Sequence, residues 1–216
     1  DAVYICTRHD SHVPLAAAAC RAKKPVFLEK PAAMSLAQAR LLEEAHRQHP
    51  VPFAVGYNMR VTPAMLRLRE LLDEAEARPH SFRANMTGPP FMQGWASDAK
   101  TGGGVLVCQG SHMLDLIAHV LKSPVAALCA DTFRIRHPLS KEPNAATILL
   151  RLENGAQGTL LLHDQGRHAM HVTPGGKMVN LTVYAPQGTF SADAYGAVGF
   201  GTKAGYFAEN PAEGLD

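Results

Sequence analysis

Lys30 is the residue whose position in this sequence most favours chemistry. It follows Glu29, precedes Pro31, and comes directly after the apolar run 25–28, which we expect to be a short buried strand. Ligands of open α/β sheets bind beyond the carboxyl ends of the strands. A lysine there can donate a hydrogen bond to a substrate oxygen and, when partly buried, exchange a proton with it. The alternative is a surface pair of Glu29 and Lys30, which would contribute little.

A second candidate group lies on a helix predicted over residues 102–122. Cys108, His112 and Asp115 are spaced four and three residues apart, so they share one face of that helix. An imidazole one turn from a carboxylate is a candidate general base near neutral pH. The alternative is a core histidine bonded to backbone, with Asp115 as its local partner. The glycine run 102–104 lets a ligand or another backbone come close.

Two further segments carry side chains that could bind a ligand. Asn58 and Arg60 follow a third predicted strand, so strand order places them near Lys30. The alternative for this segment is a connecting loop with a solvated arginine. Trp95, which is the only tryptophan, lies in a predicted loop over 89–100.

A cluster of histidines raises the question of a metal site. His163, His168 and His171 lie close together in the sequence with Asp164, and a metal-dependent lyase or hydrolase is the activity they would support. Their spacing matches no standard zinc pattern. We therefore predict no metal site and expect a mobile loop after a strand.

The elements that must position these residues fall into two parts. Residues 1–57 read as strand, helix, strand, helix, strand, which indicates a parallel sheet with right-handed crossovers. Ser35 and Gln38 form a capping box at the start of the second helix, and Pro50 follows its end. Beyond residue 57 we predict helices over 62–77 and 102–122 and strands over 80–87, from 125 onward, 146–152, 157–163, 177–185 and 188–193.

The second part is predicted to be an α+β unit. Asn154-Gly155 between two apolar segments is a strong hairpin signal, so its sheet should be mostly antiparallel. The last 20 residues are rich in glycine and alanine, and we predict no regular structure there. The fold class is therefore α/β, with a parallel unit over 1–57 and an α+β unit with an open sheet over 58–216.

Composition limits the kinds of partner. The chain has 216 residues, 46% hydrophobic and 19% charged, with a net charge of +2 and no block of like charges. A small-molecule ligand is favoured over nucleic acid. No apolar run approaches the length of a membrane span, which is about 18 residues. The four cysteines form no C-x-x-C pair and three lie in apolar runs. We therefore expect free buried thiols and a reducing compartment, the cytoplasm.

Three ordered segments resemble the glucose-fructose oxidoreductase, inositol dehydrogenase and MocA (Gfo/Idh/MocA) family of NAD(P)-dependent oxidoreductases. They resemble the last strands of its Rossmann domain with the Glu-Lys-Pro motif, the exit from that domain, and the family's catalytic helix. These segments are 1–7 with His12 and 24–31, then 55–60, then 102–115. The resemblance implies the carboxyl-terminal half of a Rossmann domain over 1–57 and a substrate-binding and oligomerisation domain over 58–216.

The resemblance also implies an activity and roles for particular residues. The implied cofactor is NAD or NADP, and the implied substrate is a secondary alcohol or ketone of a sugar, polyol or related small molecule. The implied assembly is a homo-oligomer, a dimer or tetramer, formed through the sheet. Lys30 would hydrogen-bond the substrate hydroxyl, and His112 would take its proton as hydride leaves the same carbon. The implied cofactor contacts are Thr7, His12, Glu29, Lys30 and Pro31, and the implied substrate contacts are Asp115, Cys108, Asn58, Arg60 and Trp95.

Two departures from the family pattern define the alternative function. Cys108 stands where many of the family's dehydrogenases have an aspartate, and a thiol cannot replace a carboxylate's charge. The sequence contains no G-x-G-x-x-G loop, so we expect that loop to precede residue 1 and the family's last strand and helix to follow the chain. The alternative is a non-catalytic member of the same fold that binds a ligand or partner.

Overall fold

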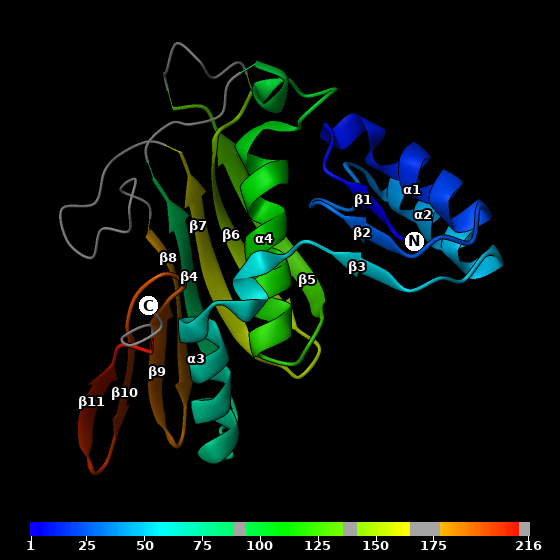
Figure 1. The fold of residues 1–216 in the computed structure, drawn as a ribbon. Coiled ribbons are helices and arrows are strands. Elements are labelled where there is room, and N and C mark those ends of the chain that lie inside the picture. Colours follow the sequence, from blue (N-terminus) through cyan, green and yellow to red (C-terminus); the bar gives the residue numbers. More distant parts are fainter. Residues whose placement is uncertain (89–93, 136–141, 165–177, 212–216) are drawn as a thin grey trace.

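The first part of the chain forms a small parallel sheet with both of its helices on one face (Figure 1). The computed structural model describes residues 1–88, 94–135, 142–164 and 178–211. The sheet order is β1-β2-β3, and both strand pairs are parallel. The elements are β1 (Val3–Ile5), η1 (His9–Ser11), α1 (His12–Arg21), β2 (Val26–Leu28), α2 (Leu36–Gln48) and β3 (Phe53–Val55).

Local signals in the sequence explain where these helices begin. The Ser35 hydroxyl accepts a hydrogen bond from the backbone N–H of Gln38 at 3.2 Å, which satisfies one of the free donors of the first turn of α2. The Gln38 side chain accepts from the backbone N–H of Met34 at 2.9 Å. The capped helix packs beside α1, and together they cover the core around Ile5 and Leu28.

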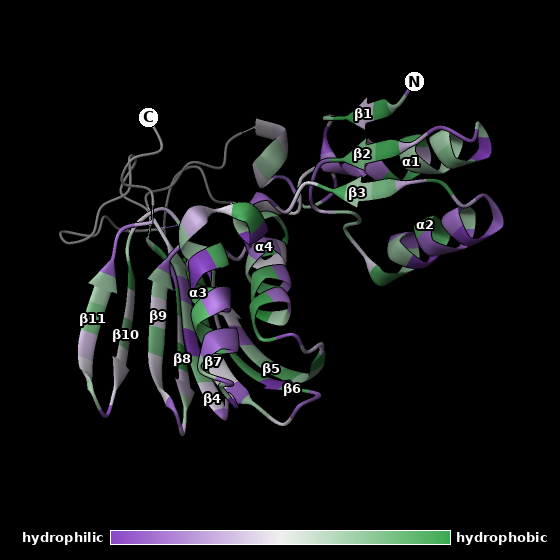
Figure 2. Cartoon of the chain, turned by 60° about the horizontal axis from the view of Figure 1, so that its bottom comes forward, coloured by the Kyte–Doolittle hydropathy of each residue, from purple (hydrophilic) through white to green (hydrophobic). Residues whose placement is uncertain are grey.

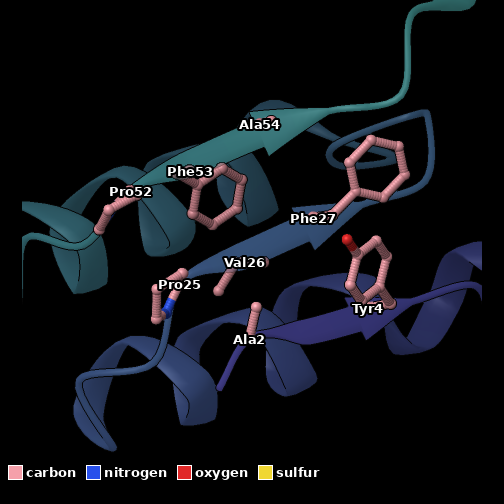
Figure 3. Close-up of a pocket in the computed structure, with 8 residues that line it drawn as sticks. All are labelled: Ala2, Tyr4, Pro25, Val26, Phe27, Pro52, Phe53 and Ala54. Carbon is pink, nitrogen blue, oxygen red and sulfur yellow. The ribbon is translucent and has the colours of Figure 1, made fainter.

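The other face of this small sheet is open in the described part of the chain (Figure 3). Tyr4 and Phe27 point away from the helices, with ring centroids 5.6 Å apart, and Tyr4 is 73% exposed. A shallow hollow of about 350 Å³ lies over the strands. It is lined by Ala2, Tyr4, Pro25, Val26, Phe27, Pro52, Phe53 and Ala54.

The second part is a large sheet with two helices packed against one face (Figure 1). Its strand order is β11-β10-β9-β8-β4-β7-β6-β5, and every pair is antiparallel except β4 with β7. The helical elements are η2 (Asn58–Val61), α3 (Pro63–Glu74), η3 (Gly94–Ser97) and α4 (Gly104–Val120). The strands are β4 (Ser81–Thr87), β5 (Val125–Phe133), β6 (Ala145–Leu152), β7 (Gln157–His163), β8 (Met178–Ala185), β9 (Gly188–Asp193), β10 (Val198–Thr202) and β11 (Gly205–Glu209).

Burial distinguishes the two helices of this part. Figure 2 shows more hydrophobic colour on α4 than on α3, whose outward face is hydrophilic. Met113, Leu116 and Ile117 of α4 are fully buried against the sheet, so α4 belongs to the main core. A helix held on most sides gives its functional side chains a fixed place.

The structure corrects two sequence predictions. The glycine-rich end of the chain is not irregular up to residue 209, because β10 pairs with β9 and β11 pairs with β10. Stacked rings of Phe200 and Phe207, 5.0 Å apart, join the two strands. The expectation of buried thiols holds for Cys20 and Cys108 and is wrong for Cys6 and Cys129, which are exposed, although all four are free as predicted.

The remaining predictions about elements agree with the structure. The strand-helix order of the first part is as expected, and the second sheet is mostly antiparallel, with a hairpin of β6 and β7 at Asn154-Gly155. No helix among the described residues has both the length and the apolar character that crossing a membrane requires.

Candidate active site

The carboxyl ends of β1, β2 and β3 bring the first group of predicted residues to one edge of the sheet. Thr7 lies beyond β1, Glu29 and Lys30 directly follow β2, and Gly56 directly follows β3. The bond between Lys30 and Pro31 is cis. Glu29 and Gly56 are closely packed, since a Cβ added to Gly56 would lie 3.1 Å from Glu29 Oε1. This edge is where parallel sheets bind ligands.

Lys30 reaches from this edge to α4 of the second part. Its Nζ donates to Cys108 Sγ at 2.9 Å and approaches the Cys108 carbonyl oxygen at 3.5 Å. These residues are 78 positions apart in the sequence. The contact places the cation of the Glu-Lys-Pro segment against the helix that carries His112.

The face of α4 predicted from spacing is directed at this junction. Cys108 and His112 are buried, at 7% and 6% exposure, one turn apart. Gly103 caps the start of the helix. Its φ of 75° is left-handed, and a Cβ added to it would lie 2.6 Å from the side chain of Val107. Glycine is therefore required where the chain enters the helix.

Tyr57 covers His112 and was not among the residues selected from sequence. The two rings meet edge to face, with centroids 5.8 Å apart. Burial, followed by the negative charge of Asp115, raises the pKa of Tyr57 above its usual value, while hydrogen bonding to Ser111 opposes this shift. The phenol therefore remains neutral and can hydrogen-bond. The available signal was its place two residues after the apolar strand and directly before Asn58.

Arg60 and Asp115 form an ion pair across the site. Arg60 Nε donates to Asp115 Oδ2 at 2.7 Å, and Arg60 Nη2 donates to Asp115 Oδ1. The guanidinium also lies 5.9 Å from the centroid of the Tyr57 ring. The hydrogen bonds that Arg60 donates to Asp115 raise the pKa of Arg60, so the guanidinium remains charged. The Asp115 side chain is 10% exposed and that of Arg60 is 45% exposed.

His9 is a second residue that the sequence reasoning missed. It is buried, its Nδ1 lies 2.6 Å from the Gly102 carbonyl oxygen, and its ring meets Trp95 edge-on with centroids 5.0 Å apart. Desolvation by burial lowers its pKa, and the charge of Lys30 lowers it further, although the bond to Gly102 opposes this. His9 therefore joins the loop after β1 to the entry of α4. Its signal was its place between Thr7 and His12.

His12 lies beneath this loop and is completely buried. Its Nδ1 is 2.8 Å from the Pro31 carbonyl oxygen, and its Nε2 is 3.1 Å from the Thr7 carbonyl oxygen. The ring thus ties the segment after β2 to the segment after β1. A side chain with no exposed surface acts on a ligand through the segments that it holds.

Asn58 and Trp95 lie at the rim of the site. Both side chains are exposed, and Asn58 hydrogen-bonds Tyr195 in the turn between β9 and β10. Among the described residues no group of histidine, cysteine, aspartate or glutamate is arranged to hold a metal ion. His168 and His171 of the predicted alternative cluster lie outside the described residues.

Comparisons with known proteins match two stretches of the chain. Residues 1–57 match the family described as "Oxidoreductase family, NAD-binding Rossmann fold", and residues 65–191 match the "GFO/IDH/MocA C-terminal domain". The chain is 26% identical over 200 residues to a myo-inositol 2-dehydrogenase of Thermotoga maritima, covering 89% of this chain and 56% of that protein.

Two further known proteins show similar levels of identity. A D-apiose dehydrogenase of Paraburkholderia graminis is 32% identical over 182 residues, covering 81% of this chain and 46% of its own length. The solved structure of GenD2 from gentamicin A biosynthesis in complex with NAD is 29% identical, with a TM-score of 0.75, covering 88% of this chain and 54% of that one. The chain thus spans about half the length of the curated relatives it matches.

Proposed function

Because this chain belongs to the GFO/IDH/MocA family of oxidoreductases, we propose that it forms the substrate-handling half of an NAD- or NADP-dependent dehydrogenase. The substrate class we propose is a sugar, polyol or related small molecule with a secondary alcohol or ketone. The observation that carries the proposal is the contact between Lys30 and Cys108, which places a cation from the first sheet on the helix of His112. Hydride transfer requires a cation and a base at one oxygen, and this contact supports such a site.

We propose that His112 is the general base and that Lys30 is its electrostatic partner. Nicotinamide, when bound, supplies the acceptor for the hydride. The His112 imidazole would take the proton of the substrate hydroxyl, and the Lys30 ammonium would donate to the same oxygen as negative charge develops on it. Burial of His112 beneath Tyr57 limits access of water to the base, which supports this role.

The polar edge of the small sheet fits the nicotinamide end of the cofactor. The donor set combines the Thr7 hydroxyl, the Glu29 carboxylate, which can accept from ribose hydroxyls, and the backbone around Lys30 and Pro31. We propose that these four residues line the cofactor. His12 is a positioning residue in this proposal, since it is buried and bonded to the segments of Thr7 and Pro31.

The substrate-binding role of the opposite wall remains our proposal. The Asp115 carboxylate would accept hydrogen bonds from further hydroxyls of the substrate. Its oxygens keep free lone pairs even though they accept two hydrogen bonds from Arg60. Cys108 would contact the substrate beside Lys30. Asn58 and Trp95 would contribute from the rim, where their exposure supports contact with a ligand.

We also propose a homo-oligomer formed through the open face of the large sheet. Large apolar side chains on β5, β6 and β7 are exposed there, although the helices cover the other face. They are Phe133, Leu149 and Leu161, which the strand register places on the face opposite to the buried Leu150. An exposed apolar sheet face supports a protein interface. The division of the chain at residue 57 and a cytoplasmic location, which the four free thiols support, also remain predictions.

Steady-state kinetics of the complete protein that contains this chain tests the proposed activity. Lys30→Ala and His112→Ala should each lower kcat by at least 10²-fold with NAD or NADP and the best sugar or polyol, since each removes a group that acts in the transition state. Lys24→Ala is the matched control, because Lys24 is exposed and lies outside the site. Wild-type turnover in both site variants would refute the catalytic assignment.

The second candidate is a non-catalytic binding protein of the same fold. Cys108 favours it, because Lys30 contacts a thiol where a carboxylate would balance its charge. Isothermal titration separates the two candidates. If the complete protein binds dinucleotide and sugar but catalyses neither oxidation nor reduction of the sugar, it is the binding protein.

A further inference from the structure

Lys30 and Cys108 place an amine and a thiol in direct contact. The Nζ to Sγ distance is 2.9 Å. Cys108 is 7% exposed and Lys30 is half-buried at the junction of the two sheets. The two side chains come from separate parts of the fold, a strand end and the centre of α4, so the surrounding packing maintains their contact. Two nucleophilic groups held this close can react with one electrophile, or can be joined once an oxidant has made the sulfur electrophilic.

The other three thiols provide an internal comparison. Cys20 is fully buried in α1, and its pKa is raised by burial, which makes it inert. Cys6 and Cys129 are exposed. In the described part of the chain none of these three is hydrogen-bonded to a lysine. Cys108 therefore differs from them in having an amine within bonding reach of the sulfur.

We propose that peroxide converts this pair into a covalent sulfur–nitrogen link between Cys108 and Lys30, so that the pair is an oxidative modification site. A sulfenic acid on cysteine condenses with a neighbouring nitrogen to a sulfenamide when geometry allows. The backbone is the usual nitrogen in that reaction. Here the side chain of Lys30 is the adjacent one.

The reaction takes two balanced steps. In the first, Cys108 sulfur attacks hydrogen peroxide and the O–O bond breaks. One oxygen becomes the sulfenic hydroxyl, and the other takes the thiol proton and leaves as water. Sulfur loses two electrons and the peroxide gains them. In the second, the Lys30 ammonium first loses one proton to solvent, and the resulting amine attacks the sulfur. The S–O bond breaks, and the departing hydroxide takes a second proton from nitrogen and leaves as water.

The link would remove the Lys30 ammonium from the site and join the first part of the chain to α4. A thiol reductant would reverse it by attacking sulfur and releasing the amine. The site would thus be closed by peroxide and reopened by thiols. This outcome does not depend on the proposed hydride transfer, because it involves only the two side chains.

Mass spectrometry of the purified protein tests the link directly. After limited hydrogen peroxide, intact mass should fall by about 2 Da, in contrast to the gain of about 16 Da for a sulfenic acid. Peptide mapping should join the Lys30 and Cys108 peptides, and dithiothreitol should separate them. Lys30→Arg and Cys108→Ser should each abolish the link, whereas the matched control Cys129→Ser should retain it. Circular dichroism confirms that each variant is folded.

A second probe separates the contact from the oxidation. o-Phthalaldehyde forms a fluorescent isoindole only where an amine and a thiol are adjacent, and this product should map to Lys30 and Cys108. Two results together would overturn the cross-link: peroxide adds oxygen at Cys108 without a mass loss of about 2 Da, and o-phthalaldehyde still forms the isoindole at this pair. Failure of the isoindole to form at this pair in folded protein would overturn the contact on which the proposal rests. Oxidation confined to Cys6 and Cys129 would also overturn it.

Discussion

Removing either partner of the Arg60–Asp115 pair should destabilise the protein unequally. The two side chains differ in exposure, with Asp115 at 10% and Arg60 at 45%. Arg60→Gln leaves a mostly buried carboxylate without its cation, which costs about 2 kcal/mol or more. Asp115→Asn leaves a guanidinium that water can solvate, and the loss is that of a partly exposed pair, about 0.5–1 kcal/mol. The expected difference is therefore about 1–1.5 kcal/mol, or roughly tenfold in the unfolding equilibrium.

Urea denaturation measures this asymmetry. Circular dichroism reports global unfolding, and the fluorescence of Trp95, the only tryptophan, reports the region of the site. The double variant Arg60→Gln with Asp115→Asn completes a cycle that isolates the pair's coupling energy. The exposed Arg47–Glu44 pair is the matched control, since single substitutions of its two partners should cost alike.

One result would refute the reasoning. If Asp115→Asn costs as much as Arg60→Gln or more, the burial of the carboxylate is not the source of the asymmetry. The argument assumes that a charge left alone is penalised in proportion to its loss of water. An equal cost would show that the two partners lose similar amounts of water, and a larger cost for Asp115→Asn would show that Arg60 is the more desolvated partner.

Three further predictions concern the pH dependence of stability, backbone packing at two glycines and the open face of the small sheet. Because burial lowers the pKa of His9, the unfolded chain binds more protons, so stability present above about pH 6.5 should fall as pH drops through the folded pKa. The urea concentration at the unfolding midpoint should fall between pH 7.5 and pH 5.5, and it should fall less in His9→Asn than in the wild-type protein. Gly158→Ala should cost roughly 2–3 kcal/mol in urea melts, because the new Cβ would lie 2.3 Å from a backbone oxygen. Gly155→Ala, in open space with a φ of +87°, should cost only the left-handed strain of about 1–2 kcal/mol. The chain should bind the apolar dye ANS, and Tyr4→Ser with Phe27→Thr should lower the fluorescence; unchanged fluorescence would mean that the dye binds elsewhere.

Much of the fold could be predicted because its signals are local. The apolar run at 25–28 and the cap at Ser35 depend on near neighbours, and both appear in the structure as β2 and the start of α2. The spacing of Cys108, His112 and Asp115 placed them on one face of a helix for the same reason, since a helix repeats every 3.6 residues. Local periodicity needs no knowledge of the rest of the chain.

The terminal hairpin could not be predicted because its cause is not local. Residues 198–209 contain glycines that weaken any intrinsic preference for a strand. The edge of β9 offers backbone groups that pair with β10 of this segment. At its end Glu209 forms an ion pair with Arg67 of α3, at 2.8 Å. An existing sheet edge therefore decided the structure of a segment that its own sequence leaves open.

The candidate site divides in the same way. Residue types and helix spacing by themselves predicted Lys30 as a donor to a substrate oxygen and His112 as a candidate general base. Only the tertiary structure decided their setting, because docking of the small sheet on α4 brings together groups far apart in sequence. It joins Lys30 to Cys108 and His9 to Gly102, over separations of 78 and 93 residues. It also pairs Asp115 with Arg60, because a carboxylate that loses water on burial is stabilised by the nearest cation that the fold supplies.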